Sequence, residues 1–140
     1  MSRSNPETRL QIVVCQYLDH ALPEGTTYWA SLNERKVDPV TGKLLNRMGR
    51  KAGVADILIC HRRSTRIHNS HLAYGQLIAI ELKLDTNPNF KTKRTNQSQA
   101  QKDWQATIEA AGGLYAVCRS LDDVEGSLTA FGVPLKARVA

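Results

Sequence analysis

Two acids and one lysine occupy two short apolar segments of this chain of 140 residues. Asp56 interrupts the apolar run at residues 54–60, and Glu81 and Lys83 stand two positions apart within residues 76–85. Aspartate is disfavoured in strands, so its position inside an apolar run indicates a role other than packing. Two carboxylates make a hard oxygen site that suits Mg2+ or Mn2+, and a lysine beside them can stabilise negative charge in a transition state. This combination predicts hydrolysis of a phosphodiester bond by a metal-activated water.

Both segments are expected to be neighbouring strands of one sheet. Apolar residues alternate with a period of two along residues 76–85, which puts Glu81 and Lys83 on one face. Consecutive strands lie side by side in about two-thirds of cases, and Asp56 would then lie next to Glu81. The backbone carbonyl of Leu82 would add a further oxygen ligand. The competing interpretation is an ordinary solvent-facing strand, which suffices to explain the Glu–Lys pair when that pair is taken alone.

The rest of the chain predicts helices packed on a small mixed β-sheet. Helices are expected at residues 6–20, with Asn5 as the N-cap and Pro6 at the first helical position, from Ser98 to the glycines at 112–113, and after Ser120. Further strands are expected at residues 26–32 and 114–119. The predicted loops are residues 33–53, with a turn at 38–42 and a helical turn near 44–48, then 61–73 and 86–96. The predicted order is α-β-β-β-α-β-α, an α/β fold in one domain at residues 1–140, with its core at about 5–130 and a tail at 131–140 that frays from Pro134 onward.

The charge of the chain favours a polyanionic partner, because the net charge is +6 and the pI is about 9.5. The basic residues gather in three expected loops, namely Arg35, Lys36, Lys43, Arg47, Arg50 and Lys51, then Arg62, Arg63 and Arg66, then Lys91, Lys93 and Arg94. A solvated loop explains any one cluster equally well, but three clusters beside the same two strands favour a phosphate backbone. The residues expected to contact nucleic acid are Asn33, Arg35, Lys36, Arg50, Lys51, Lys91, Lys93 and Arg94, although Asn33 also fits a turn.

Composition argues against several other classes of protein. No apolar run approaches the roughly 18 residues of a membrane span, and the first eight residues lack the apolar stretch of a secretory signal. The three cysteines are scattered, which predicts reduced, buried thiols, and the four histidines lack the spacing of zinc ligands beside them. The chain is therefore expected in the cytoplasm or nucleoid, or in the host cytoplasm if a phage encodes it.

The order of the motifs resembles a known family. Asp56 followed by Glu81-Leu82-Lys83 resembles the PD-(D/E)xK nuclease superfamily, and the surrounding motifs resemble its VRR-NUC domain. The matching pieces are Glu7, Asn33, Gly49-x-x-x-Gly53-x-x-Asp56, Ile80-Glu81-Leu82-Lys83, Ser98-x-x-Gln101-x-x-Trp104, Gly113 and Arg119. The resemblance spans about residues 5–130. Ala55 departs from the proline that the superfamily often has, at a position that shapes the strand and donates no ligand.

The resemblance implies a restriction-endonuclease-like core and a DNA endonuclease that depends on Mg2+ or Mn2+. Asp56 and Glu81 would be metal ligands and Lys83 the catalytic lysine. Glu7 would be a further ligand or would hold water, and Gln101 matches the family's helix glutamine near the active site. Stand-alone domains of this kind resemble structure-selective nucleases of branched or junction DNA, often homodimers.

Competing explanations exist for some of these residues and for the function. Ser4-x-x-Glu7 and Ser98-x-x-Gln101 both fit the capping box, which satisfies helix N-terminal donors without any catalysis. Trp104 is expected in the core, because it shares a helical face with apolar residues. The alternative function is a non-catalytic nucleic-acid-binding module of the same fold. A sequence-specific restriction-type enzyme is less favoured, because no segment resembles a base-reading element.

Overall fold

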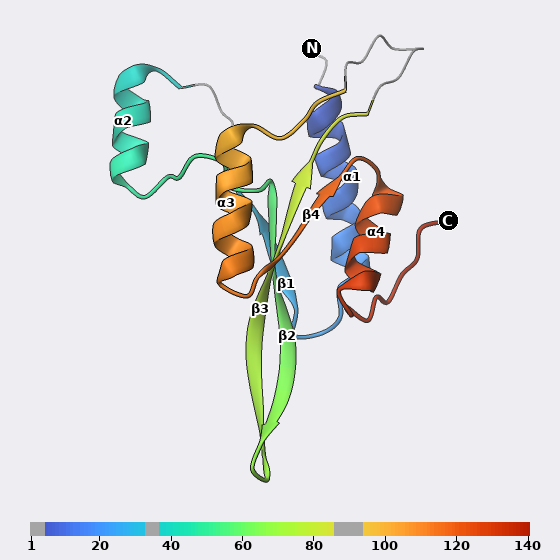
Figure 1. The fold of residues 1–140 in the computed structure, drawn as a ribbon. Helices are drawn as coiled ribbons and strands as arrows, with labels where there is room; N and C mark the ends of the chain where they lie inside the picture. Colours follow the sequence, from blue (N-terminus) through green and yellow to red (C-terminus); the bar gives the residue numbers. More distant parts are fainter. Residues whose placement is uncertain (1–4, 33–36, 86–93) are drawn as a thin grey trace.

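A computed structural model describes residues 5–32, 37–85 and 94–140 of the chain (Figure 1). Its centre is a four-stranded sheet in the order β1-β2-β3-β4. The strands are β1 at Thr27–Ala30, β2 at Ile57–Ile67, β3 at Ser70–Leu82 and β4 at Leu114–Cys118. The pairs β1–β2 and β2–β3 are antiparallel, and β4 is parallel to β3. The predicted mixed sheet is confirmed.

The helices cover both faces of this sheet. They are α1 at Pro6–Ala21, α2 at Pro39–Arg47, α3 at Gln99–Ala110 and α4 at Leu121–Ala130. In Figure 1, α1 and α4 lie on one side of the sheet and α3 on the other. Asn5, Ser98 and Ser120 cap α1, α3 and α4 as predicted, each accepting a hydrogen bond from a backbone N–H of the first turn. No helix in the described part of the chain is long and apolar enough to cross a membrane.

Two apolar clusters fix the sheet between the helices. The larger cluster joins the isoleucines of β2 and β3 to Val14 and Leu18 of α1 and to Val124 and Leu128 of α4. The smaller cluster lies on the opposite face of the sheet, where Trp104 of α3 packs against it, as expected. Because both faces are covered, the end of β3 from Ile78 to Leu82 is entirely buried, including its acid.

Helix α2 replaces the turn predicted at residues 38–42, so that prediction was wrong and the predicted order lacked this helix. Asp38 is the N-cap of α2, and its carboxylate accepts hydrogen bonds from the backbone N–H of Thr41 at 3.0 Å and from its hydroxyl at 2.6 Å. Pro39 is the first helical residue. An Asp-Pro pair opens turns and helices alike, so it did not discriminate between them. The helix buries no residue and stands apart from the others in Figure 1.

A long hairpin replaces the polar connection predicted at residues 61–73, which was also wrong. β2 and β3 pair continuously from Ile57↔Ile80 to Ile67↔Ser70, and β1 pairs only with residues 57–60 of β2. β4 pairs only with residues 78–82 of β3. Residues 61–76 therefore form a two-stranded ribbon, called the ribbon below, which projects from the body of the molecule (Figure 1). Its exposed positions have no buried face to select alternating apolar residues, so the sequence gave no strand signal there.

The segment after α4 is packed, which contradicts the expected fraying from Pro134 onward. Val133 is buried, the backbone N–H of Lys136 donates to the carbonyl of Ala21 at 2.8 Å, and the Tyr17 hydroxyl donates to the carbonyl of Ala137 at 2.9 Å. The segment therefore ties α4 to the end of α1. Cys118 is buried as expected, whereas Cys15 and Cys60 are half-buried, and all three are free thiols.

Candidate active site

The sheet register brings Asp56 and Glu81 together. Ile57 pairs with Ile80, so the next position outward sets Asp56 opposite Glu81. Asp56 lies directly before β2 rather than inside it, and its carboxylate Oδ2 accepts a hydrogen bond from the backbone N–H of Leu82 at 2.7 Å. The backbone of Asp56 is held in turn, because its carbonyl accepts from the N–H of Ser31 at 2.9 Å. The predicted neighbourhood of the two acids therefore follows from strand pairing.

Glu81 is fully buried in a network of hydrogen bonds. Its Oε1 accepts from Nε2 of Gln101 at 2.8 Å and lies 3.6 Å from Nζ of Lys83, and its Oε2 accepts from the Tyr115 hydroxyl at 3.4 Å. Lys83 follows the end of β3 and is itself only 7% exposed. Burial of a carboxylate costs free energy unless it is paired and hydrogen-bonded, and this network meets that requirement.

Tyr115 reports the negative charge of the site. Burial, followed by the charge of Glu81, raises the pKa of Tyr115 well above its ordinary value, and the charge of Asp56 contributes in the same direction. The phenol therefore remains protonated and can donate to Glu81. Both acids therefore contribute to the negative potential at the same hydroxyl.

Gln101 both completes a capping box and reaches the buried acid Glu81. Its backbone N–H donates to Oγ of Ser98 at 3.2 Å, and its Oε1 accepts from the backbone N–H of Ser98 at 2.8 Å, which completes a capping box. The remaining amide group, Nε2, donates to Glu81. The side chain is therefore fully used, with one end on the helix terminus and the other on the buried acid.

The loop before Asp56 positions α3 by close packing. Gly53 has φ +80°, and a Cβ at this position would lie 2.2 Å from the carbonyl oxygen of Ala100. Only glycine fits both the backbone conformation and the contact. The chain therefore passes close to the start of α3 at Gly53, three residues before Asp56.

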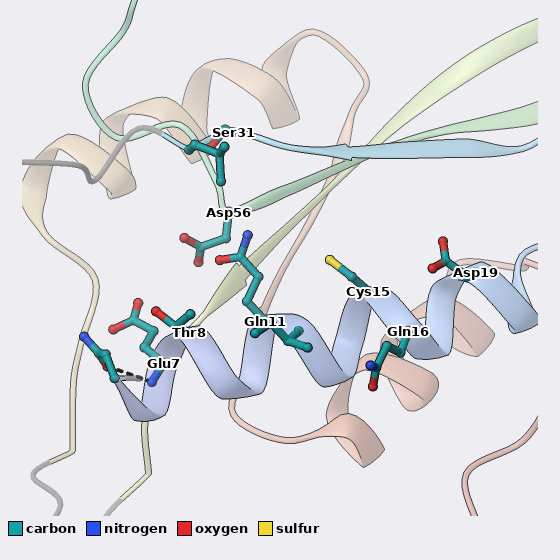
Figure 2. A pocket seen from close by; sticks show the side chains of 11 residues that line it. Glu7, Thr8, Gln11, Cys15, Gln16, Asp19, Ser31 and Asp56 are labelled. Carbon is teal, nitrogen blue, oxygen red and sulfur yellow. Dashed lines mark hydrogen bonds between the residues drawn. The ribbon is translucent and has the colours of Figure 1, made fainter. Parts of the chain in front are cut away.

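Glu7 faces Asp56 across a cleft of about 610 Å3 between α1 and the ends of β1 and β2. Figure 2 shows the two carboxylates turned toward one another, with the side chain of Gln11 reaching toward Asp56 from the next turn of α1. The side chain of Asn5 accepts from the N–H of Glu7 at 2.9 Å, so Asn5 is the N-cap and Glu7 is the second helical residue. A capping box needs its acid one position later, so that explanation of Glu7 does not apply.

Gln11 and Ser31 line the same cleft, and the sequence interpretation did not include them. Gln11 follows Glu7 by four residues, and this spacing alone places both side chains on one face of α1. Ser31 follows β1 and donates from Oγ to the carbonyl of Ala55 at 2.6 Å, a contact that no local sequence pattern indicates.

The oxygen donors suit a hard divalent cation by type. Mg2+ is held by one or two carboxylates and keeps several waters, and Glu7 and Asp56 present half-buried carboxylates to one cleft. Within residues 5–32, 37–85 and 94–140, no group of three or more His, Cys, Asp or Glu side chains could hold a metal ion as it stands. The expected set of Asp56, Glu81, Glu7 and the carbonyl of Leu82 is thus divided between the cleft and the buried network.

The residues expected to contact nucleic acid are only partly described. Asn33, Arg35, Lys36, Lys91 and Lys93 lie outside the described residues. Lys51 and Arg94 are exposed. Arg50 donates to Oδ1 of Asn46 at 3.0 Å and to the carbonyl of Gly42 at 3.3 Å, so it braces α2.

Arg119 acts beside the site as a brace. One guanidinium nitrogen, Nη1, donates to the carbonyl of Leu84 at 2.6 Å and to that of Thr95 at 2.7 Å. These bonds fix the backbone directly after Lys83. Arg119, which the resemblance placed near the end of β4, therefore stabilises the backbone that carries Lys83.

Among solved structures, the chain is similar to one described as a "VRR_NUC domain protein". The two are 22% identical, and the match covers 93% of this chain and 90% of the other with a TM-score of 0.61. At this identity the likeness shows the fold, so the expected α/β fold, a small mixed sheet flanked by helices as in the VRR_NUC domain protein, is confirmed. No family model matches the sequence, and no curated protein matches it.

Proposed function

We propose that this VRR-NUC-like fold serves as a metal-dependent DNA endonuclease. One observation carries the proposal: strand pairing sets Asp56 opposite Glu81, with Lys83 3.6 Å from Glu81, at the end of the sheet that borders an open cleft. A surface that only binds nucleic acid gains nothing from acids directed at phosphates, because like charges repel. Two acids and a lysine in this arrangement suit hydrolysis better than binding.

Each residue has a defined part in the proposed reaction. Asp56 and Glu7 would hold the cation from the cleft, with Glu81 and the carbonyl of Leu82 behind them. A bound Mg2+ or Mn2+ would supply an acidified water and positive charge at the scissile phosphate. Lys83 orients the attacking water and adds positive charge where the phosphate becomes more negative. Gln101 is a positioning residue, because it holds Glu81 through Nε2.

The test is cleavage of a plasmid and of single-stranded and branched DNA, with Mg2+, with Mn2+ and with EDTA. Asp56→Asn and Lys83→Met keep the size of each side chain, and each should lower the cleavage rate by about 100-fold or more. Asp122→Asn is the matched control, because Asp122 is exposed on α4 and lines neither the cleft nor the network around Glu81, so this variant should cleave as the unaltered chain does. Circular dichroism checks that each variant is folded. Full activity in Asp56→Asn, or cleavage that persists in EDTA, would refute the proposal.

A second candidate function is favoured by the burial of Glu81. This acid is 0% exposed and both of its oxygens have partners, which is also what a purely structural carboxylate would show. The chain would then be a non-catalytic nucleic-acid-binding module of the same fold. Salt-sensitive DNA binding without cleavage in any divalent metal would favour this second function.

Substrate and assembly form the finer part of the proposal. We infer a preference for branched or junction DNA and a homodimer, and we place the activity in the cytoplasm or nucleoid. Two symmetric copies would present two sites to a two-armed substrate. Faster cleavage of a junction than of its linear arms, together with a sedimenting dimer at micromolar concentration, would support this inference. A monomer without junction preference would contradict it.

A further inference from the structure

The ribbon is a basic projection on the described surface. Its sixteen positions, residues 61–76, contain three arginines, three histidines and no Asp or Glu. Neither of the ion pairs found among the described residues involves it. Beyond residue 60 it is flanked by neither β1 nor β4, although at its base the backbone N–H of Arg62 donates to Oγ1 of Thr26 at 3.2 Å. A two-stranded hairpin is marginally stable alone, which makes such a projection costly unless it serves a purpose.

Strand pairing sorts the side chains of the ribbon onto two faces. The pairs Arg62↔Gly75, Ser64↔Ala73 and Arg66↔His71 share one face, because paired residues point the same way and successive pairs alternate. All six of these residues are exposed. This basic face therefore combines two arginines and a histidine with three small residues, so nothing bulky separates a ligand from the cations.

The opposite face differs in chemistry. It carries Ile67, Leu72 and Tyr74, each between 47% and 49% exposed. Its arginine, Arg63, is engaged, because its guanidinium donates to Gln76 and to the carbonyl of Phe131. Arg63 thus anchors the base of the ribbon to the segment after α4, while the basic face remains available for a partner.

We propose that the ribbon is an arm that binds duplex DNA through its basic face, formed by Arg62, Ser64, Arg66, His71, Ala73 and Gly75. Charge complementarity selects the partner: arginines bind phosphate oxygens in a forked geometry, and an acid-free surface imposes no repulsion. The major groove of B-DNA, about 12 Å wide, admits a two-stranded ribbon. The choice of DNA rather than another polyanion rests on the proposed function.

The position of the arm suits a substrate that extends away from the site. Six residues of β3 separate Gly75 from Glu81, which is about 20 Å at the rise of a strand. The basic face therefore begins roughly six base pairs of duplex from the acids and continues outward to the turn. The arm would hold the flank of a duplex rather than the bond that is cut.

The test measures binding in EDTA, so that cleavage cannot contribute. The fluorescence anisotropy of a labelled duplex is followed as salt is raised from about 50 to about 200 mM. Arg62→Gln combined with Arg66→Gln should raise the Kd about tenfold and reduce the slope of log Kd against log salt by about 1.8, the value for two phosphate contacts. Arg138→Gln is the matched control, since Arg138 is exposed and distant from the ribbon in sequence, paired with Glu125 at 3.9 Å.

The outcomes separate this inference from the proposed function. The proposed arm would be refuted by an unchanged Kd and slope in the double variant, or by an equal loss of affinity in Arg138→Gln. It would also be refuted if the unaltered chain bound anionic vesicles better than the duplex. If the unaltered chain bound duplex through the arm but did not cleave it with any divalent metal, the result would support the arm and refute the proposed nuclease activity. Asp122→Asn should bind the duplex as the unaltered chain does, because Asp122 belongs to neither the ribbon nor the cleft.

Discussion

Gln101 shows how one side chain can cap a helix and hold a buried acid at once. Its carbonyl oxygen caps α3 and its amide nitrogen holds Glu81. Gln101→Ala removes both contacts and leaves a buried carboxylate short of a partner, which should lower the free energy of unfolding by about 1–3 kcal/mol. It should also slow cleavage, because Glu81 loses its position. Unfolding in urea and a cleavage assay give the two readouts.

Ser98→Ala is the matched control for this prediction. It removes the cap of α3 without touching Glu81, and should lower the free energy of unfolding by about 1 kcal/mol with cleavage retained. Equal cleavage defects in the two variants would show that Gln101 acts only through the helix.

His61 should make stability depend on pH. Burial, with a smaller contribution from the charge of Arg63, lowers the pKa of His61, and its Nδ1 lies 3.0 Å from Oγ1 of Thr26. The unfolded chain therefore binds the proton more readily than the folded chain. The contribution of neutral His61 to the free energy of unfolding is fully present above the ordinary histidine pKa of about 6.5, and it is lost as the pH falls below that value. Urea unfolding between about pH 8 and pH 5.5 should show the decline, and His61→Gln should flatten it. A slope unchanged in the variant would assign the decline to other groups.

Asp56, Glu81, Lys83 and, by resemblance, Gln101 could be picked out from the sequence as candidates, but Tyr115 could not. Asp56 was conspicuous because it interrupts an apolar run, and Glu81 and Lys83 followed from a period of two. The burial of Glu81 was not foreseeable, since alternation usually directs charged residues to water. Its cover comes from Gln101 and Tyr115, which lie 20 and 34 residues away.

At the scale of the elements, the close contact between the loop at Gly53 and the start of α3 can be tested with two matched glycine variants. Gly49 and Gly53 both have positive φ, at +104° and +80°, but a Cβ on Gly49 would meet nothing within 4 Å. Gly49→Ala should therefore lower the free energy of unfolding only by the backbone strain, about 1–2 kcal/mol. Gly53→Ala adds a collision with the backbone of Ala100 and should cost about 1–3 kcal/mol more, while displacing Gln101 and reducing cleavage. Equal urea midpoints for the two variants would refute the role of close packing.

The predicted elements were confirmed where a buried face selects the residues. The helices at α1, α3 and α4 and the buried halves of β2 and β3 each show the expected period, because one side packs on a core. α2 and the ribbon bury little, so packing left no pattern there to detect. The Asp38-Pro39 pair correctly predicted a change in backbone direction, but it was interpreted as a turn and not as the start of α2.

For the whole molecule, the segment after α4 determines how firmly α1 and α4 are joined. Deleting residues 134–140 removes the bonds from Lys136 to Ala21 and from Tyr17 to Ala137, and the packing of Leu135. The free energy of unfolding should fall by about 2–3 kcal/mol, from roughly 1 kcal/mol for each hydrogen bond and for the buried apolar side chain. Removal of Ala140 alone is the control. A urea midpoint unaffected by the longer deletion would contradict this role.

The order of strands is a property of the whole chain. Because consecutive strands usually lie side by side, the sequence predicted that β2 pairs with β3 and that Asp56 lies next to Glu81. The parallel addition of β4 beside β3 depends on α3 crossing the sheet, which no short segment specifies. The general fold could be predicted by resemblance, and the likeness in structure confirmed it.

The ribbon also gives the molecule a point of attachment for engineering. Its tip, His68 and Asn69, joins strands whose pairing next to the site, Ile57↔Ile80 and Leu58↔Ala79, is held independently by both cores. A peptide epitope inserted between His68 and Asn69 should leave the fold intact, because exposed turns tolerate insertion. Removing two facing residue pairs would shorten the reach and preserve which side each remaining residue faces. The length of the projection is thus a variable that can be changed without altering the geometry of the candidate site.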